Sequence, residues 1–218
     1  MRIVEKVIFL VLSFLIIIGV VWAWVDIRGF EGIYVREDGF IEWLTVLALL
    51  ASAFLCGLRW WRFKGQNKLL AFTMLALAGV FIFGAGEEIS WGQRIFGIES
   101  SAFFKTHNSQ GETNLHNLLL KGKSINKIIF GTFLGICVGL YFLVLPYLYR
   151  TKNRVKELVD TFGIPIPTVF HIVAYLILFI LASICVSPKR GELLEVGGCT
   201  IFFMMLWFPY NKEIYEKK

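Results

Sequence analysis

The sequence predicts an all-α integral membrane protein, a single domain over residues 1–218 with about six transmembrane helices. Of the 218 residues, 57% are hydrophobic and only 17% are charged, whereas about a quarter of the residues in a soluble domain are charged. Six apolar runs are long enough to cross a bilayer. Lys and Arg gather at alternate ends of these runs, as they do in multi-pass membrane proteins.

A span needs about 20 mostly apolar residues. The six runs cover residues 7–25, 41–59, 69–86, 128–148, 166–186 and 194–210. The first is longer than the apolar core of a signal peptide and lacks a small-x-small cleavage motif, so we expect a retained helix. The last is short and contains Gly197 and Gly198.

Charge predicts the orientation. The side with both termini and the loops 59–68 and 149–165 carries thirteen basic and five acidic residues, and the other side carries nine and eleven. The positive side faces the cytoplasm, so both termini are predicted to be cytoplasmic. Trp60 and Trp61 then lie at the inner boundary, and Trp43 and Trp91 at the outer one.

Several functional classes receive no support. The chain has no GxSxG, HExxH, P-loop or dinucleotide-binding motif. The net charge of +6 follows the loops and does not indicate a nucleic-acid partner. Cys56, Cys137, Cys185 and Cys199 all lie in apolar segments and are expected to be free.

One long outer loop, about 87–127, is expected to be partly helical. Connections of this length are often functional. Its segments 95–105 and 109–120 are apolar enough to lie in the interface or to dip back into the bundle. Such a re-entrant element would bring Glu112 and His116 toward Glu87 and Glu88.

Glu87, Glu88 and His116 are the candidate catalytic residues. Glu87 and Glu88 are adjacent carboxylates between apolar stretches, which is costly unless they are paired, protonated or bound to a cation. An ion pair with Arg94 is the structural alternative. Without a metal, buried like charges leave one carboxyl protonated for acid–base work.

A metal site near Glu87 and Glu88 is the second possibility. Glu88, Glu112 and His116 offer oxygen and nitrogen ligands that suit zinc, manganese or iron. Five further residues are expected to support the site: Asp38, Glu42, Arg94, Asn117 and Glu195. Glu195 lies inside a span, where an acid is by default a functional hypothesis.

Structural alternatives stand beside these assignments. Glu42 fits a first-turn acid that favours the helix dipole, and Ser109-x-x-Glu112 fits a capping box. Glu192 is expected to be a solvated loop residue. His171, in the inner half of the fifth run, is expected to be a packed, hydrogen-bonded helix residue.

Two strings, Glu87–Gly97 (EEISWGQRIFG) and Asn108–Asn117 (NSQGETNLHN), resemble a pattern of uncharacterised bacterial integral membrane proteins. This resemblance implies a bacterial inner (plasma) membrane location and no particular activity. Glu87, Glu88, Arg94, His116 and Asn117 are also similar in type to the motif residues of intramembrane CAAX-type proteases. The arginine comes later here than in that motif, and the later histidine-containing helix motifs are missing.

Three functions remain open. The first is a membrane-embedded enzyme, a metal-dependent hydrolase or transferase that acts on a lipid or lipid-linked substrate at the extracytoplasmic face. The second is a non-catalytic membrane subunit that docks a protein partner. The third is a transporter or channel for a cation or small solute.

Overall fold

The protein is described by a computed structural model that covers residues 2–120, 123–124 and 133–216. The elements are α1 (Ile3–Val25), α2 (Ile27–Gly29), the π-helical turn η1 (Phe30–Tyr34), α3 (Phe40–Phe63), α4 (Lys68–Glu88), the 3-10 turn η2 (Ser90–Gly92), α5 (Gln93–Phe96), α6 (Ala102–His107), β1 (Leu119–Leu120), β2 (Lys123–Ser124), α7 (Leu134–Gly139), the π-helical turn η4 (Leu140–Val144), α8 (Leu145–Thr151), α9 (Asn153–Phe162), α10 (Val169–Ser183), the 3-10 turn η5 (Pro188–Arg190), α11 (Gly191–Trp207) and α12 (Glu213–Glu216).

Four predicted spans are confirmed as helices long and apolar enough to cross a membrane. They are α1, α3, α4 and the continuous segment Leu134–Thr151. The part of the fourth predicted span over residues 128–132 lies outside the described residues. Helices α10 and α11 have 15 and 17 residues, so the count of six spans stays a prediction.

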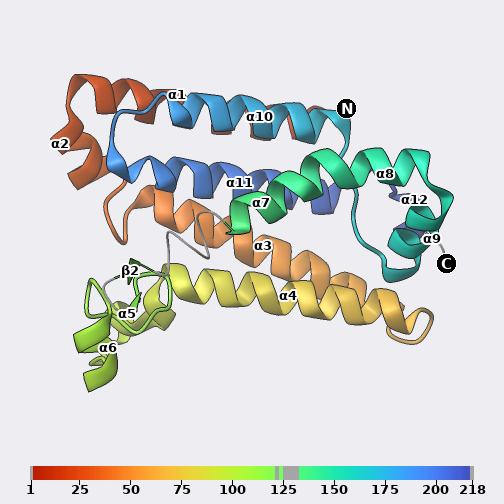
Figure 1. Ribbon diagram of the computed structural model, residues 1–218, viewed down its shortest axis with the longest axis horizontal. Coiled ribbons are helices and arrows are strands. Elements are labelled where there is room, and N and C mark those ends of the chain that lie inside the picture. The colour runs from red at the N-terminus through yellow and green to blue at the C-terminus, as the bar shows by residue number, and fades with distance from the viewer. Residues whose placement is uncertain (1, 121–122, 125–132, 217–218) are drawn as a thin grey trace.

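The helices form an elongated bundle with α11 in its interior. Helices α3 and α4 form an antiparallel hairpin, and Asn67 caps α4 by accepting hydrogen bonds from the backbone N–H groups of Leu69 and Leu70, each 3.1 Å long. Helix α11 packs on α3, and α10 packs on both α11 and α1 (Figure 1). The backbone N–H and C=O groups of each helix form hydrogen bonds within that helix. The core between the helices is filled by apolar side chains such as Ile16, Met74 and Ile201.

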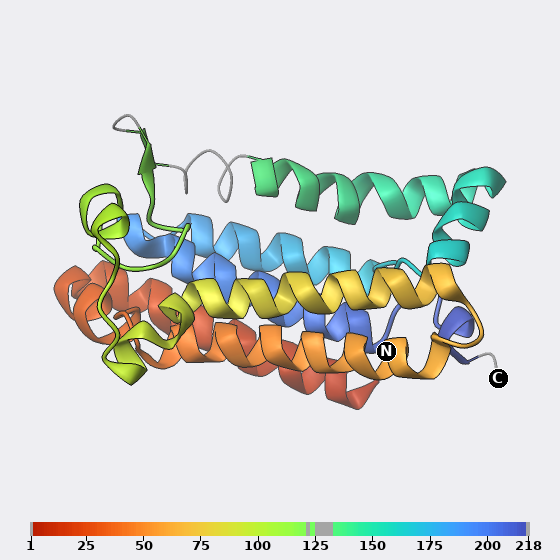
Figure 2. The same cartoon turned by 90° about the horizontal axis from the view of Figure 1, so that it is seen from below.

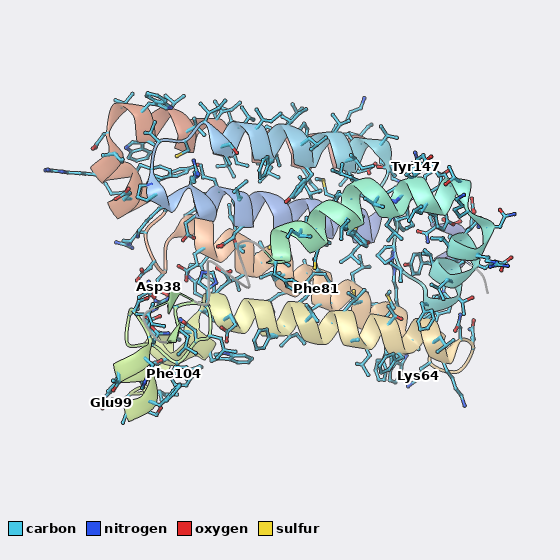
Figure 3. All side chains as sticks on the ribbon, viewed as in Figure 1. Asp38, Lys64, Phe81, Glu99, Phe104 and Tyr147 are labelled. Carbon is cyan, nitrogen blue, oxygen red and sulfur yellow. The ribbon has the colours of Figure 1, made fainter. Side chains whose placement is uncertain are left out.

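The two ends of the bundle differ. Both chain termini lie at one end, together with α9, α12 and the α3–α4 turn (Figures 1 and 2). In Figure 3, Lys64 lies at this end, while Asp38, Glu99 and Phe104 lie at the other. That the termini share one end agrees with the predicted topology; which end faces the cytoplasm stays a prediction.

The second end is covered by a cap, which we define as residues 89–118. The cap contains η2, α5 and α6, so the predicted partly helical loop at 87–127 has helices within its described part. An antiparallel pairing of β1 with β2 follows the cap; residues 121–122 and 125–127 lie outside the described residues. All four cysteines are free, as expected.

Candidate functional site

Arg94 of α5 joins the cap to the start of α3. Its guanidinium Nη1 lies 2.7 Å from the Glu112 carboxylate, its Nη2 lies 3.2 Å from Glu42, and its Nε lies 2.7 Å from Asp38. Glu37 is more distant, at 3.9 Å. Although burial opposes the shift, the hydrogen bond and charge of Glu112 raise the pKa of Arg94 above its usual range. Arg94 therefore stays charged and holds three chain segments together.

Glu112 is held on its second oxygen as well. Its Oε2 accepts a hydrogen bond of 2.5 Å from the Ser90 hydroxyl and one of 3.3 Å from the Asn114 side-chain amide. Asn108 closes the turn, since its Oδ1 accepts from the backbone N–H groups of Gln110 and Glu112. The predicted Ser109–Glu112 capping box does not form, because these residues lie in a turn and not in a helix.

Glu87 anchors the cap to the end of α4. One of its oxygens accepts a 2.8 Å hydrogen bond from the Trp91 indole N–H, and the other accepts from the backbone N–H groups of Leu115 and His116 at 2.6 and 3.0 Å. The loop thus folds back onto α4, as the re-entrant hypothesis expected. Three donors neutralise the cost of burying this carboxylate. The alternative of an ion pair between Arg94 and Glu87 or Glu88 is wrong, since Arg94 pairs with other acids.

His116 lies at the inner side of the cap, with its backbone tied to Glu87. Burial lowers the pKa of its imidazole from 6.5, against the opposing charge of Glu87, and the ring is therefore neutral at neutral pH. The neighbouring Asn117 donates from its side chain to Gln110 at 2.6 Å. His116 is thus close to Glu87, while Asn117 stabilises the turn.

Glu88, Glu192 and Glu195 form a second group, which we call the acidic cluster. Glu88 ends α4, and the other two lie on the first turns of α11. Each is partly exposed. Glu195 lies within electrostatic range of Glu88, Glu192 and Glu42. None of the three cluster residues makes a hydrogen bond or an ion pair of 4.0 Å or less with any residue that the structure describes.

One side of the acidic cluster is apolar. Cys199, one turn after Glu195 on α11, packs against a small core formed by Val46, Leu49 and Ala85 of α3 and α4. The cluster therefore lies where three helices meet, with hydrocarbon on its inner side. Glu192 was expected to be a solvated loop residue, and that expectation is wrong: it belongs to α11 and is only partly exposed.

The predicted metal ligands are only partly brought together. Glu112 is bonded to Arg94 and Ser90, and the backbone N–H of His116 is bonded to Glu87. Over residues 2–120, 123–124 and 133–216, no three His, Cys, Asp or Glu side chains are arranged to hold a metal ion. A metal site of Glu88, Glu112 and His116 stays a prediction without geometric support.

Three expectations about single residues can be compared directly. Glu42 lies in the first turn of α3, accepts from the Asp38 backbone N–H at 3.0 Å and also binds Arg94. Asp38, which was expected to support the site, precedes the helix with a φ of 55° and pairs with Arg94 at 2.7 Å. His171 is fully buried and lies 3.1 Å from Glu5, as expected for a packed, hydrogen-bonded residue.

Sequence reasoning missed the neutral residues that organise the cap. Ser90 and Asn114 are buried and bonded to each other at 2.8 Å. Gln93 accepts from the Thr113 backbone N–H at 2.7 Å and donates to the Ser100 hydroxyl at 2.6 Å. The density of amide and hydroxyl side chains around Gly111 was the available signal, because such residues favour self-bonded turns.

Comparison of the chain with protein-family models, with curated proteins and with solved structures found no match.

Proposed function

We propose that the protein is a membrane-embedded enzyme that acts on a lipid or lipid-linked substrate at the capped end of the bundle. The observation that carries the proposal is the acidic cluster. Glu88, Glu192 and Glu195 lie together beside an apolar wall, and no described cation lies within 4.0 Å of any of them, although the charge of Lys189 acts on Glu192 from farther away. An arrangement that costs folding free energy and stabilises nothing locally is typical of a functional site.

Carboxyl groups that crowd together beside hydrocarbon cannot all ionise, so one keeps its proton at neutral pH and can give it to a leaving group while a neighbour is ionised. In this proposal Glu195 is the general acid and Glu88, at the α4 terminus, is the base that activates water or a hydroxyl group. The reaction class is hydrolysis or group transfer. Both residues are only partly buried in the bundle.

The cap supports this role by fixing the end of α4. Glu87, the residue before Glu88, is locked by three donors, which sets the direction of the next side chain. Arg94 pairs with Glu42 and Glu112 and forms no ion pair of 4.0 Å or less with the acidic cluster. Glu87, Arg94 and Asn117 are then positioning residues, and His116 lines the approach beside Glu87.

The cellular setting is part of the proposal. We place the protein in a bacterial inner membrane with the capped end extracytoplasmic, because the end with the termini carries the excess of Lys and Arg. Its partners would be membrane lipids and a lipid-linked substrate. A divalent metal (zinc, manganese or iron) at Glu88, with Glu112 and His116, remains a variant of the mechanism.

A non-catalytic docking role is the second candidate. It is favoured by the Arg94 network, which is satisfied almost entirely within the chain. Transport has less support. The main core of the bundle, with Leu178, Ile201 and Met204, is a cluster of apolar side chains, and the buried hydroxyls of Thr45 and Ser52 donate to carbonyls of their own helix α3.

The test is turnover in proteoliposomes made from a total bacterial lipid extract, followed by mass spectrometry of the lipids. We expect the wild-type protein to convert at least one lipid species, and Glu88→Gln and Glu195→Gln to lose about 10²-fold or more of that rate. Glu99→Gln is the matched control, because Glu99 lies at the same end but is exposed and paired with Lys105 at 2.7 Å. Wild-type turnover in both cluster variants would exclude the proposed roles.

Elemental analysis separates the metal variant from plain carboxyl chemistry. Purified wild-type protein, Glu88→Gln and His116→Ala are compared after preparation without chelators. Stoichiometric metal in the wild type that is lost in both variants supports the metal-dependent mechanism. A metal-free wild type with full turnover leaves acid–base catalysis by the acidic cluster. If no lipid is converted but a protein co-purifies in fixed ratio, the docking role is favoured.

A further inference from the structure

At the opposite end of the bundle, near both termini, the structure contains a cavity of about 510 Å³. Its walls come from the starts of α1 and α10, the end of α3 and the segment after α11. They combine the cations Arg2, Arg59 and Lys212 with aromatic side chains such as Trp207 and Phe208. A basic pocket with an aromatic rim is the composition that binds anionic head groups at a membrane surface.

Arg59 is the central group. Its Nη2 donates to the Leu206 carbonyl at 2.5 Å, and its guanidinium lies 3.8 Å from the centre of the Tyr215 ring. Its Nη1 is buried and has no hydrogen-bond partner among the described residues. A buried, charged donor without a partner is unfavourable, so an anion that accepts from Nη1 would relieve this cost.

The other charges of the pocket leave room for such an anion. Glu5 is used by His171 at 3.1 Å and by the Arg2 backbone N–H at 2.8 Å. Glu216 lies 3.6 Å from Lys212. Within the described part of the chain, no carboxylate lies within 4.0 Å of the Arg59 or Arg2 guanidinium. Arg2 instead lies over the Phe208 ring, 4.5 Å from its centre.

We propose that this pocket binds a phosphate group, held by Arg59 with Arg2 beside it. Guanidinium groups match phosphate oxygens with paired, charge-assisted hydrogen bonds. The volume admits a phosphate with a glycerol unit, and the aromatic rim suits the junction between a head group and its acyl chains. The phosphate belongs either to an anionic phospholipid or to a soluble phosphate ester. This site is distant from the acidic cluster and independent of any turnover there.

The experiment is a binding titration of delipidated protein in detergent, with two ligands. Phosphatidylglycerol in mixed micelles tests the lipid source, and glycerol 3-phosphate tests the soluble one. Binding of the lipid alone assigns the site to a phospholipid, and binding of both assigns it to the phosphate group itself. For whichever ligand binds, we expect Arg59→Leu to weaken binding by about tenfold or more and Arg59→Lys to weaken it less.

Arg62→Leu is the matched control. It removes the same charge from the same end of α3, but Arg62 is exposed and outside the pocket. Arg59→Leu keeps the apolar stem, and circular dichroism checks that each variant is folded. The proposal is overturned if the wild type binds neither ligand, or if Arg59→Leu and Arg62→Leu weaken binding equally, since only surface charge would then matter.

Discussion

A single guanidinium, that of Arg94, lies among four carboxylates. Two of its partners, Glu42 and Glu112, are nearly buried, with side-chain exposures of 10% and 13%, and Arg94 itself is 24% exposed. Removing the cation would leave like charges facing each other in a poorly hydrated place. The loss is therefore larger than for a surface pair and smaller than for a fully buried one.

Arg94→Ala is expected to destabilise the protein by about 2 kcal/mol, an intermediate between exposed and buried ion pairs. Arg94→Lys is expected to recover part of the loss, because one ammonium cannot reach Asp38, Glu42 and Glu112 together. The measurement is denaturant-induced unfolding in detergent. Arg36→Ala, an exposed arginine at the same end, should change little; an equal loss there would remove the special role of Arg94.

The roles of the adjacent Glu87 and Glu88 could be predicted from the sequence only in part. Two adjacent carboxylates after an apolar run predicted that at least one has a special role. Which one accepts backbone donors depends on the return of residues 115–116 to the α4 terminus. That return is a tertiary event, set by the turn around Asn108 and Gly111, and no local pattern encodes it.

At the scale of the elements, the end of α4 is held by a close contact between a tryptophan ring and a glycine. Trp91 has a φ of 55°, and its ring lies against Gly86, where an added Cβ would come within 2.8 Å of the ring. Only glycine permits this approach. The contact directs the indole N–H to Glu87, so the packing of one helical turn fixes the polar anchor of the cap.

Gly86→Ala is expected to destabilise the protein by about 1–3 kcal/mol, because the ring must move and its bond to Glu87 weakens. Gly79→Ala in the same helix is the control. Among the described residues, no atom outside the backbone of its own helix lies within 4 Å of its added Cβ, and replacing a helical glycine with alanine stabilises by about 0.5–1 kcal/mol. Thermal unfolding of the two variants should therefore shift in opposite directions, and shifts of the same sign would contradict the packing argument.

Element prediction succeeded where apolar length was decisive, as in α1, α3 and α4. It was less complete for α10 and α11, which have 15 and 17 residues. The cap was predicted only as partly helical. Its form depends on side-chain hydrogen bonds between residues 90–117, such as Gln93 with Thr113, and these have no hydrophobic period that a sequence pattern would reveal.

For the whole molecule, the asymmetry of charge predicts its orientation in the membrane. Lys64 marks the end with the termini, and Glu99 marks the capped end (Figure 3). Arg190 is exposed and lies between α10 and α11. Its location relative to the membrane therefore shows whether these two shorter helices cross the membrane. If they do, Arg190 belongs on the side of Glu99.

Cysteine labelling in intact cells measures this directly, in a background with Cys137→Ser because Cys137 is exposed. A membrane-impermeant maleimide is expected to label Glu99→Cys and Arg190→Cys without permeabilisation, and Lys64→Cys only after it. The opposite pattern would invert the orientation. Labelling of Arg190→Cys together with Lys64→Cys would mean that α10 and α11 do not span the membrane.

The contacts of the cap also have a consequence for synthesis of the chain. Glu42, Arg94 and Glu112 all belong to the first 118 residues, whereas Glu192 and Glu195 follow much later. If the helices enter the membrane in chain order, the cap can close on α3 and α4 before α11 has been made. A chain that ends before residue 190 would keep the contacts of the cap but lack α11, and the side of α3 that packs on α11 would be uncovered.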